Sequence, residues 1–404
     1  MSKLSIRDIE LRNKRVFIRV DFNVPLSEDG STITDDTRIV ATLPTIEYAL
    51  RHHAKVILAS HLGRPKGKPN PKYSLRPVVD RLRELLDKHI GESINVAFSP
   101  DCVGEIAEEM SRQLESRQVL LLENLRFHAE EEANDPAFSR QLASLAEVYC
   151  NDAFGSAHRA HASTEGITHF IKPSVAGLLM EKEITYLGKA LENPEKPFVA
   201  IIGGSKISGK IDVIQNLLDK VDTLVIVGGM AYTFYRSKGV ATGKSLVEED
   251  KIDLAKQTLE KAKAKGVNLL LPVDNILADG FSNDAKTQPW DTSKDFPADW
   301  QGLDIGPKSV ATIEDVISRA RTIVWNGPAG VFEFPNFAKG TNAIARAVAA
   351  NKASTSIIGG GDSVSAINQA GVADQITHIS TGGGASLEFL EGKKLPGVEA
   401  LTNK

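Results

Sequence analysis

The sequence predicts an α/β protein with two doubly wound, Rossmann-like domains, each built on a parallel sheet. Short apolar runs of strand length alternate with amphipathic helical segments along all 404 residues. This alternation is typical of parallel sheets covered by helices on both faces. Two closely spaced prolines, Pro194 and Pro197, follow one helical segment near the middle of the chain. Since proline ends a helix, these residues indicate a linker between two domains.

The apolar runs define the expected strands in chain order. In the first half they lie within "RVFIRVDFNVP", "KVILASHLGRP", "INVAFSPDC", "VLLLENLRF" and "VYCNDAFGSAHR". In the second half they lie within "FVAIIGGSK", "TLVIVGGM", "NLLLPVD", "TIVWNGPAG", "TSIIGGGDS" and "THISTGGGAS". Helices are expected in "SLRPVVDRLRELLDKH", "DKIDLAKQTLEKAKAKG" and "KGTNAIARAVAAN". Residues 286–309 follow no clear period, so a long irregular loop is expected there.

The domain limits follow from the same pattern. Residues 1–174 form the expected first domain, and residues 195–387 form the second. Helical spacing over residues 175–192, closed by the two prolines, predicts an interdomain helix and linker over 175–194. A hinge at this linker and a central cleft are therefore expected.

The composition indicates a cytoplasmic protein without nucleic-acid or membrane partners. The net charge is −4 and 42% of the residues are apolar, so an anion site needs a local concentration of positive charge. Cys102 and Cys150 give neither a disulfide framework nor a C-x-x-C pattern. The first residues show no signal-peptide pattern, and no apolar run approaches the roughly 20 residues of a membrane span.

Charged residues follow the expected strands of the first half. Ligands of open α/β sheets bind beyond the carboxyl ends of the strands. The residues at those ends are Asp21, Asn23, His61, Arg64, Arg126, His158, Arg159 and His161, with Arg38 near the first turn of a helix. A single arginine can be a solvated surface charge, but several at successive strand ends predict a site for a small, hydroxylated anion. His158 and His161 could suggest a metal, although phosphate contact or packing fits better without nearby acidic ligands.

Glycines follow the expected strands of the second half. They occur at 203–204, 228–229, 327, 359–361 and 382–384. Glycine lets backbone amides approach phosphate oxygens closely, so the set predicts a nucleotide site. Asp362 suits Mg²⁺ within such a site, and a helix N-cap is its alternative role. Glu333 is a candidate partner of ribose hydroxyls.

The stretch "GSKISGKI" nearly matches the P-loop pattern. Ile211 stands where that pattern needs Ser or Thr for Mg²⁺, which argues against a P-loop NTPase. Lys206 and Lys210 are four residues apart, so they share one face if they lie on a helix. A dinucleotide oxidoreductase lacks its G-x-G-x-x-G after the early strands. A two-lobed binding protein without activity would explain the anion site but not the nucleotide-type glycines.

Eight longer segments carry a more specific signal. "RVDFNVP", "SHLGRP", "LLENLRFHAEEE", "NDAFGSAHRAH", "IIGGSKISGK", "IVWNGPAGVFE", "IIGGGDS" and "STGGGASLEFLEGKKLPGVEAL" resemble, in order, the signature segments of the phosphoglycerate kinase family. The resemblance implies reversible phosphoryl transfer between 1,3-bisphosphoglycerate and MgADP, giving 3-phosphoglycerate and MgATP in glycolysis. It also implies a monomer whose tail, residues 388–404, packs on the first domain.

The resemblance further implies a role for each matching residue. Those facing phosphoglycerate are Asp21, Phe22, Asn23, Arg38, His61, Leu62, Gly63, Arg64, Arg126 and Arg159. Those facing the nucleotide are Lys210, Gly302, Glu333, Gly360, Gly361, Asp362 and Ser363, with Asp362 toward the metal. Arg38 and Lys206 flank the transferring phosphoryl group, and Gly383 and Gly384 offer it backbone amides. Ser363 stands where many members have Thr, and both side chains carry a hydroxyl. The nucleophile is a carboxylate, already ionised at pH 7, so in-line transfer on domain closure needs no general base.

Overall fold

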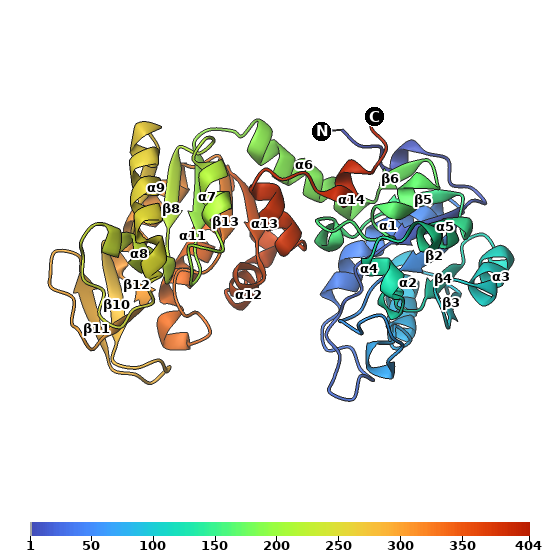
Figure 1. Cartoon of the computed structure of the whole chain (residues 1–404), viewed down its shortest axis with the longest axis horizontal. Helices are drawn as coiled ribbons and strands as arrows, with labels where there is room; N and C mark the ends of the chain where they lie inside the picture. The colour runs from blue at the N-terminus through green and yellow to red at the C-terminus, as the bar shows by residue number, and fades with distance from the viewer. Residues whose placement is uncertain (1) are drawn as a thin grey trace. The chain divides into compact units, whose positions relative to one another are not determined.

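A computed structural model describes residues 2–404 and divides the chain into two compact units. Unit 1 holds the chain up to Thr185 together with Lys394–Lys404, and unit 2 holds Tyr186–Lys393. The division falls inside helix α6 (Leu178–Glu192), within the segment expected to join two domains (Figure 1). Among the described residues, no helix combines the length and apolar character needed to cross a membrane.

Unit 1 is built on a six-stranded parallel sheet with the order β3-β4-β2-β1-β5-β6. The strands are β1 (Arg15–Arg19), β2 (Lys55–Ala59), β3 (Val96–Ser99), β4 (Val119–Leu122), β5 (Val148–Asn151) and β6 (Ser174–Ala176). The helices are α1 (Thr37–Arg51), α2 (Val78–Ile90), α3 (Glu105–Gln113), α4 (Ala129–Glu132), α5 (Pro136–Ser144) and α14 (Pro396–Glu399). All five strands expected in this half are present, and the sequence did not reveal β6.

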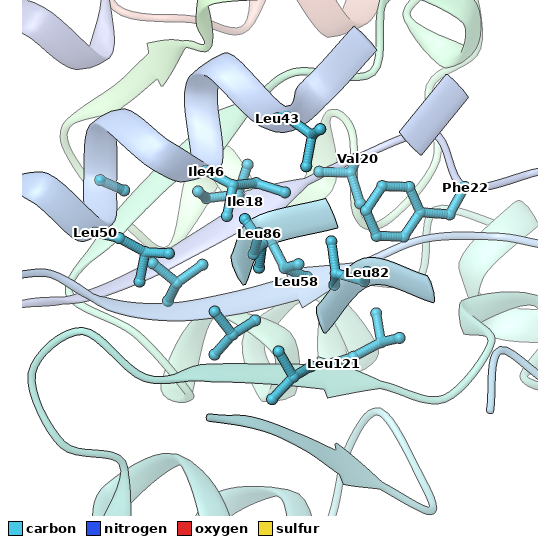
Figure 2. Packing of buried hydrophobic residues seen from close by; sticks show 14 of the residues in the cluster. Ile18, Val20, Phe22, Leu43, Ile46, Leu50, Leu58, Leu82, Leu86 and Leu121 are labelled. Carbon is cyan, nitrogen blue, oxygen red and sulfur yellow. The ribbon is translucent and has the colours of Figure 1, made fainter. Parts of the chain in front are cut away.

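The core of unit 1 lies between the sheet and helices α1 and α2 (Figure 2). Leu43, Ile46 and Leu50 lie three and four residues apart on α1, so their side chains share the face that packs on the strands. Ile18 and Leu58 project into this layer from β1 and β2. Strands β1 and β2 are buried on both faces, which explains their continuous apolar sequence.

Unit 2 repeats the architecture with a parallel sheet of order β15-β14-β13-β7-β8-β9. Its strands are β7 (Phe198–Ile202), β8 (Thr223–Ile226), β9 (Asn268–Leu270), β13 (Thr322–Asn326), β14 (Thr355–Gly359) and β15 (His378–Ile379). Its helices are α7 (Ile211–Leu217), α8 (Met230–Ser237), α9 (Ile252–Ala264), α10 (Pro307–Arg319), α11 (Lys339–Ala350), α12 (Gly361–Gln369) and α13 (Gly384–Leu390).

The expected irregular loop over residues 286–309 is wrong. This segment holds β11 (Thr287–Asp291) and β12 (Gln301–Ile305), which flank β10 (Asp274–Ala278) in a three-stranded antiparallel sheet. Strand β11 contains Pro289, which lacks a backbone donor but is tolerated because β11 is an edge strand. Polar residues and proline concealed the strand pattern of this small sheet.

The helix expected from residue 175 begins later, at Leu178, because Ser174–Ala176 pairs with β5 as β6. The buried carboxylate of Asp152 accepts hydrogen bonds from the backbone N–H groups of Leu179 and Met180 at 2.9 and 3.1 Å. These bonds satisfy two of the unpaired donors of the first turn of α6. The start of α6 is therefore set by a side chain that follows β5.

The C-terminal segment lies in unit 1 from Lys394 onward, whereas residues 388–393 belong to unit 2. The backbone of Thr402 bonds to Leu4 and to Ser174 at 2.8 Å each. Gly397 packs so tightly that a Cβ on it would lie 2.9 Å from the Cα of Ala157. The two ends of the described chain are thus joined by backbone hydrogen bonds inside unit 1.

Truncation of a core side chain should destabilise unit 1 far more than truncation on its surface. We expect Leu58→Ala to lower the free energy of unfolding by about 2–5 kcal/mol, because Leu58 is fully buried against α1 and α2. Ile106→Ala is the control, since Ile106 is 56% exposed, and it should cost less than about 0.5 kcal/mol. Urea unfolding measures both, and equal losses would contradict this packing.

Candidate active site

The carboxyl ends of the parallel strands in unit 1 gather the residues expected to bind phosphoglycerate. Asp21, Phe22 and Asn23 follow β1, His61, Leu62, Gly63 and Arg64 follow β2, Arg126 lies in a 3₁₀ turn after β4, and Arg159 follows β5. Arg38 lies in the first turn of α1, as expected. Because these strands are neighbours in a parallel sheet, their ends meet at one edge.

Hydrogen bonds hold the loops of this edge to one another. Arg38 Nη1 donates to Asp21 Oδ2 at 2.8 Å, and burial of Asp21 makes this more than a surface ion pair. Asn23 Oδ1 accepts from the backbone N–H of Gly63 at 2.9 Å, which ties the β1 loop to the β2 loop. The arginine that should reach a ligand is therefore restrained before any ligand binds.

Arg126 is held from both sides while it stays at the edge. Its Nη1 donates to the carbonyl of Gly63 at 3.0 Å, and its Nε lies 3.6 Å from Glu132 Oε1. Its side chain is only 8% exposed, so its charge is largely removed from water. A buried guanidinium of this kind attracts an anion more strongly than an exposed one.

Two expected contacts can involve only the backbone or the loop around them. Phe22 and Leu62 are buried, and both side chains belong to the hydrophobic core of unit 1 (Figure 2). Arg64 and Arg159 are exposed, and Arg159 Nε donates to His158 Nε2 at 3.3 Å. The side chains available to an anion are thus the polar and charged members of the set.

The sequence analysis missed Arg19, the last residue of β1. Its side chain is fully buried, and its Nη2 lies 3.2 Å from His61 Nδ1. A lone arginine inside the apolar run "VFIRV" was the available signal, since buried arginines need partners.

The positive charges of this edge control its histidines. Burial lowers the pKa of His61 well below 6.5, and Arg19, Arg126 and Arg38 act in the same direction while Asp21 opposes them. Burial, with Arg126, Arg19 and Arg159, lowers the pKa of His161 to about 4. Burial would raise the pKa of Asp21, but His61, Arg38 and Arg19 together hold it below its ordinary value. The edge therefore combines fixed guanidinium charges, an ionised carboxylate and neutral imidazoles.

Unit 2 contains a cavity of about 380 Å³ beyond the carboxyl ends of β7, β8 and β13. Residues expected to bind the nucleotide, Gly302, Glu333 and Asp362, line it. The other lining residues are Gly204, Ser205, Gly228, Gly229, Tyr232, Leu246, Asn275, Phe281, Gln301, Leu303, Asp304, Pro328, Ala329, Gly330 and Val331. Backbone, apolar and aromatic groups dominate this lining, as in most cofactor sites.

Some of the glycines serve close packing between loops. A Cβ on Gly203 would lie 2.3 Å from the carbonyl oxygen of Pro328, and one on Gly327 would lie 2.2 Å from that of Gly203. The loops after β7 and β13 can cross only because neither residue has a side chain. Gly302 is similar, since its Cβ would lie 1.6 Å from the hydroxyl oxygen of Tyr232. These glycines shape the cavity wall as well as exposing backbone.

Lys206 and Lys210 do not share a helix face, because α7 begins only at Ile211 and Lys210 is its N-cap. Lys206 is exposed in the loop, whereas Lys210 is partly buried and its Nζ donates to Asn326 Oδ1. Burial lowers the pKa of Lys210, while Asp362 and Glu391 oppose that shift. Asn326 Nδ2 is buried without a hydrogen-bond partner among the described residues, so it is a donor that the sequence analysis missed.

The loops after β14 and β15 carry the remaining expected residues. Asp362 is in the first turn of α12 and is not its N-cap, because Gly360 holds that position. Ser363 is buried, and its Oγ accepts from the backbone N–H of Gly327 at 2.6 Å, so its hydroxyl joins two loops. Gly383 has φ +48° and precedes α13, which begins at Gly384. That backbone conformation favours glycine.

A Mg²⁺ ion bound with phosphates typically needs a free carboxylate. Asp362 is exposed at the cavity, and its carboxylate oxygens make no hydrogen bond to any described residue. Oxygen donors of this kind fit Mg²⁺, which keeps several waters beside one or two carboxylates.

Comparisons with known proteins agree with this geometry. The family model described as phosphoglycerate kinase matches residues 6–393. A phosphoglycerate kinase of Acidobacterium capsulatum is 74% identical over 404 residues, which is 100% of both chains. A cytosolic phosphoglycerate kinase of Triticum aestivum is 57% identical, covering 98% of this chain and 97% of its own. The solved structure of phosphoglycerate kinase from Coxiella burnetii has a TM-score of 0.89 and 43% identity, with 98% of each chain covered.

Two histidines of unit 1 should titrate in opposite directions. We expect His161 to titrate near pH 4, because burial and neighbouring arginines disfavour its charged form. His128 should titrate above 6.5, because its Nε2 bonds Asp101 Oδ1 at 2.7 Å. His161 therefore weakens the folded state as the pH falls from 6.5 toward 4, where only the unfolded chain gains its proton. His128 contributes stability below 6.5 that is lost as the pH rises through its folded pKa.

The measurement is a pH titration of the histidine NMR signals of the free protein, assigned with His161→Gln and His128→Gln. Equal midpoints near 6.5 would contradict the electrostatics described for this edge.

Proposed function

The chain belongs to the phosphoglycerate kinase family, and on that premise we propose which of its residues bind and transfer the phosphoryl group. It is a glycolytic kinase that transfers a phosphoryl group reversibly between 1,3-bisphosphoglycerate and ADP, giving 3-phosphoglycerate and ATP. The observation that carries the assignment is the contrast between the two sheet edges. One gathers arginines, and the other gathers glycine loops around a cavity.

Phosphoglycerate is proposed to bind at the carboxyl edge of the unit 1 sheet. Arg64, Arg126, Arg159 and Arg38 supply the positive charge that its phosphate and carboxylate need. Asp21 and Asn23 suit its hydroxyl group, and His61 adds a neutral hydrogen-bonding group. Phe22, Leu62 and Gly63 contribute backbone, because two of their side chains are in the core and the third has none.

The nucleotide is proposed to bind in the cavity of unit 2. Its base and ribose fit the wall that contains Gly302 and Glu333, and its phosphates lie toward Lys210 and Asp362. Gly360 and Gly361 offer backbone at the start of α12, where negative charge is favoured. Asn326 Nδ2 is a further donor for a phosphate oxygen. Ser363 acts through the loop that it holds.

Mg²⁺ is proposed to accompany the nucleotide with Asp362 as its protein ligand. When bound, the ion neutralises charge on the nucleotide phosphates. Lys210 is oriented by Asn326 so that its charge also serves the phosphates.

The transfer step depends on charge and orientation. Arg38 and Lys206 are proposed to stabilise the equatorial oxygens of the phosphoryl group in flight, and the N–H groups of Gly383 and Gly384 assist them. The carboxylate of 3-phosphoglycerate attacks directly and in line, so no protein group must remove a proton. Arg38 belongs to unit 1 and Lys206 to unit 2, so this proposal requires domain closure during turnover.

A coupled assay tests the nucleotide and acceptor together. Protein mixed with MgATP and 3-phosphoglycerate should release ADP and form an acyl phosphate, and omission of either substrate should stop both. Release of ADP without 3-phosphoglycerate would favour a simple ATPase. All proposed catalytic groups come from one chain, so we expect a monomer by light scattering. Two relatives are named as cytosolic proteins, which supports a cytoplasmic enzyme.

Loss of either proposed phosphoryl-binding cation should slow turnover strongly. We expect Arg38→Ala and Lys206→Ala each to lower kcat by about 10²–10³-fold, the range for one positioned group that stabilises transition-state charge. Arg12→Ala and Lys238→Ala are controls, since both residues are exposed. Initial rates at saturating substrates measure the effect, and circular dichroism checks the fold. Near-normal kcat in either site variant would exclude the role given to that residue.

Removal of the proposed metal ligand should change the Mg²⁺ requirement. We expect Asp362→Asn to raise the Mg²⁺ concentration for half-maximal rate by about 10-fold or more, since even groups that only orient a ligand have effects of that size. Asp374→Asn, a change at another exposed aspartate of unit 2, is the control. A Mg²⁺ titration at fixed ATP gives the result, and an unchanged midpoint in Asp362→Asn would remove Asp362 from the metal site.

A further inference from the structure

A buried polar chain lies behind the anion-binding edge of unit 1. Glu131 of α4 accepts from the hydroxyl of Ser163 at 2.5 Å and from its backbone N–H at 3.0 Å. Ser163 Oγ in turn accepts from Arg19 Nε at 2.8 Å. Arg19 Nη1 donates to the carbonyl of Val20, and Nη2 lies 3.2 Å from His61 Nδ1. Arg19, Ser163 and Glu131 are all fully buried, so these bonds replace water for each group.

The chemistry of the last bond assigns the proton of His61. A guanidinium group has five donors and no acceptor. Nδ1 of His61 must therefore accept from Arg19, which means that it carries no proton. A neutral imidazole has one protonated nitrogen, so the proton lies on Nε2.

The opposite nitrogen of the ring is available to a ligand. Nδ1 and Nε2 point in nearly opposite directions, so a ring bonded inward through Nδ1 directs Nε2 away from Arg19. The described residues make no hydrogen bond to Nε2. Asp21, Arg38 and Arg126 are the charged groups around His61, and none of them bonds its ring. Nε2 is therefore an unused donor at an edge built for anions.

We propose that Arg19 is a positioning residue that holds His61 in the Nε2–H tautomer, so that His61 donates a hydrogen bond to an anionic oxygen of phosphoglycerate. Ser163 and Glu131 hold Arg19 in place, and the Glu131 carboxylate balances its charge. The inference rests on the proposed function for its ligand. The tautomer itself is a property of the free protein.

The first experiment reads the tautomer directly. Long-range ¹H–¹⁵N spectra of the free protein should show His61 with Nδ1 unprotonated and Nε2 protonated at pH 7. A protonated Nδ1 or a doubly protonated ring would overturn the assignment, whatever the activity of the protein.

The second experiment removes the donor without leaving a buried charge. Arg19→Met combined with Glu131→Gln keeps the region neutral, and His61 should then populate both tautomers. The KM for 3-phosphoglycerate should rise by about 10-fold or more, as expected for one lost hydrogen bond to a charged group, while the KM for ATP stays unchanged. Arg19→Lys keeps a donor that cannot accept, so it should restore the single tautomer and part of the affinity. A single tautomer and unchanged KM in the double variant would overturn the role of Arg19.

Side-chain amides at position 61 give an independent check that does not depend on Arg19. The amide nitrogen of glutamine reaches approximately the place of Nε2, and that of asparagine approximately the place of Nδ1. His61→Gln should therefore bind 3-phosphoglycerate more tightly than His61→Asn, and the reverse order would contradict donation from Nε2. Failure of the proposed function would differ, since wild-type protein would then show the Nε2–H tautomer without 3-phosphoglycerate-dependent turnover.

Discussion

Parallel pairing of the strands is the constraint on which both candidate sites depend. In a parallel sheet every strand ends at the same edge, so residues from β1, β2, β4 and β5 meet although they are far apart in the sequence. The same rule gathers the loops after β7, β8 and β13 around the cavity of unit 2. The strands can be parallel because helices cover their faces and make them fully apolar. The core and the position of each site therefore have one cause.

The two edges use opposite solutions to the binding of anions. The edge of unit 1 relies on guanidinium groups, which need buried partners to stay in place. Arg19 bonds Ser163 and His61, and Arg126 bonds Gly63. The edge of unit 2 relies on backbone and a few cations, and its glycines let loops cross without side chains between them. A net negative chain can thus bind polyanions, because its positive charge is local and fixed in position.

The sequence predicted most of what depends on local pattern. The apolar runs identified eleven of the strands, and the motifs identified the loops that follow them. The sequence did not predict β10–β12, where polar edge strands and Pro289 conceal the pattern. It also could not show that Lys206 and Lys210 precede α7, because the start of a helix depends on backbone geometry that spacing does not determine. The roles of Ser363 and Arg19 come from tertiary hydrogen bonds with residues up to 144 positions away.

Burial of Arg19 explains how the edge of unit 1 keeps its imidazoles neutral. A positive charge inside the sheet raises the free energy of an imidazolium beside it, so His61 has a depressed pKa although Asp21 is near. A charged His61 could attract an anion but would lose its bond with Arg19, since both groups would then be donors. The hydrogen bond and the electrostatic repulsion therefore favour the same neutral form. The guanidinium supplies charge through Arg38 and Arg126, and His61 supplies direction.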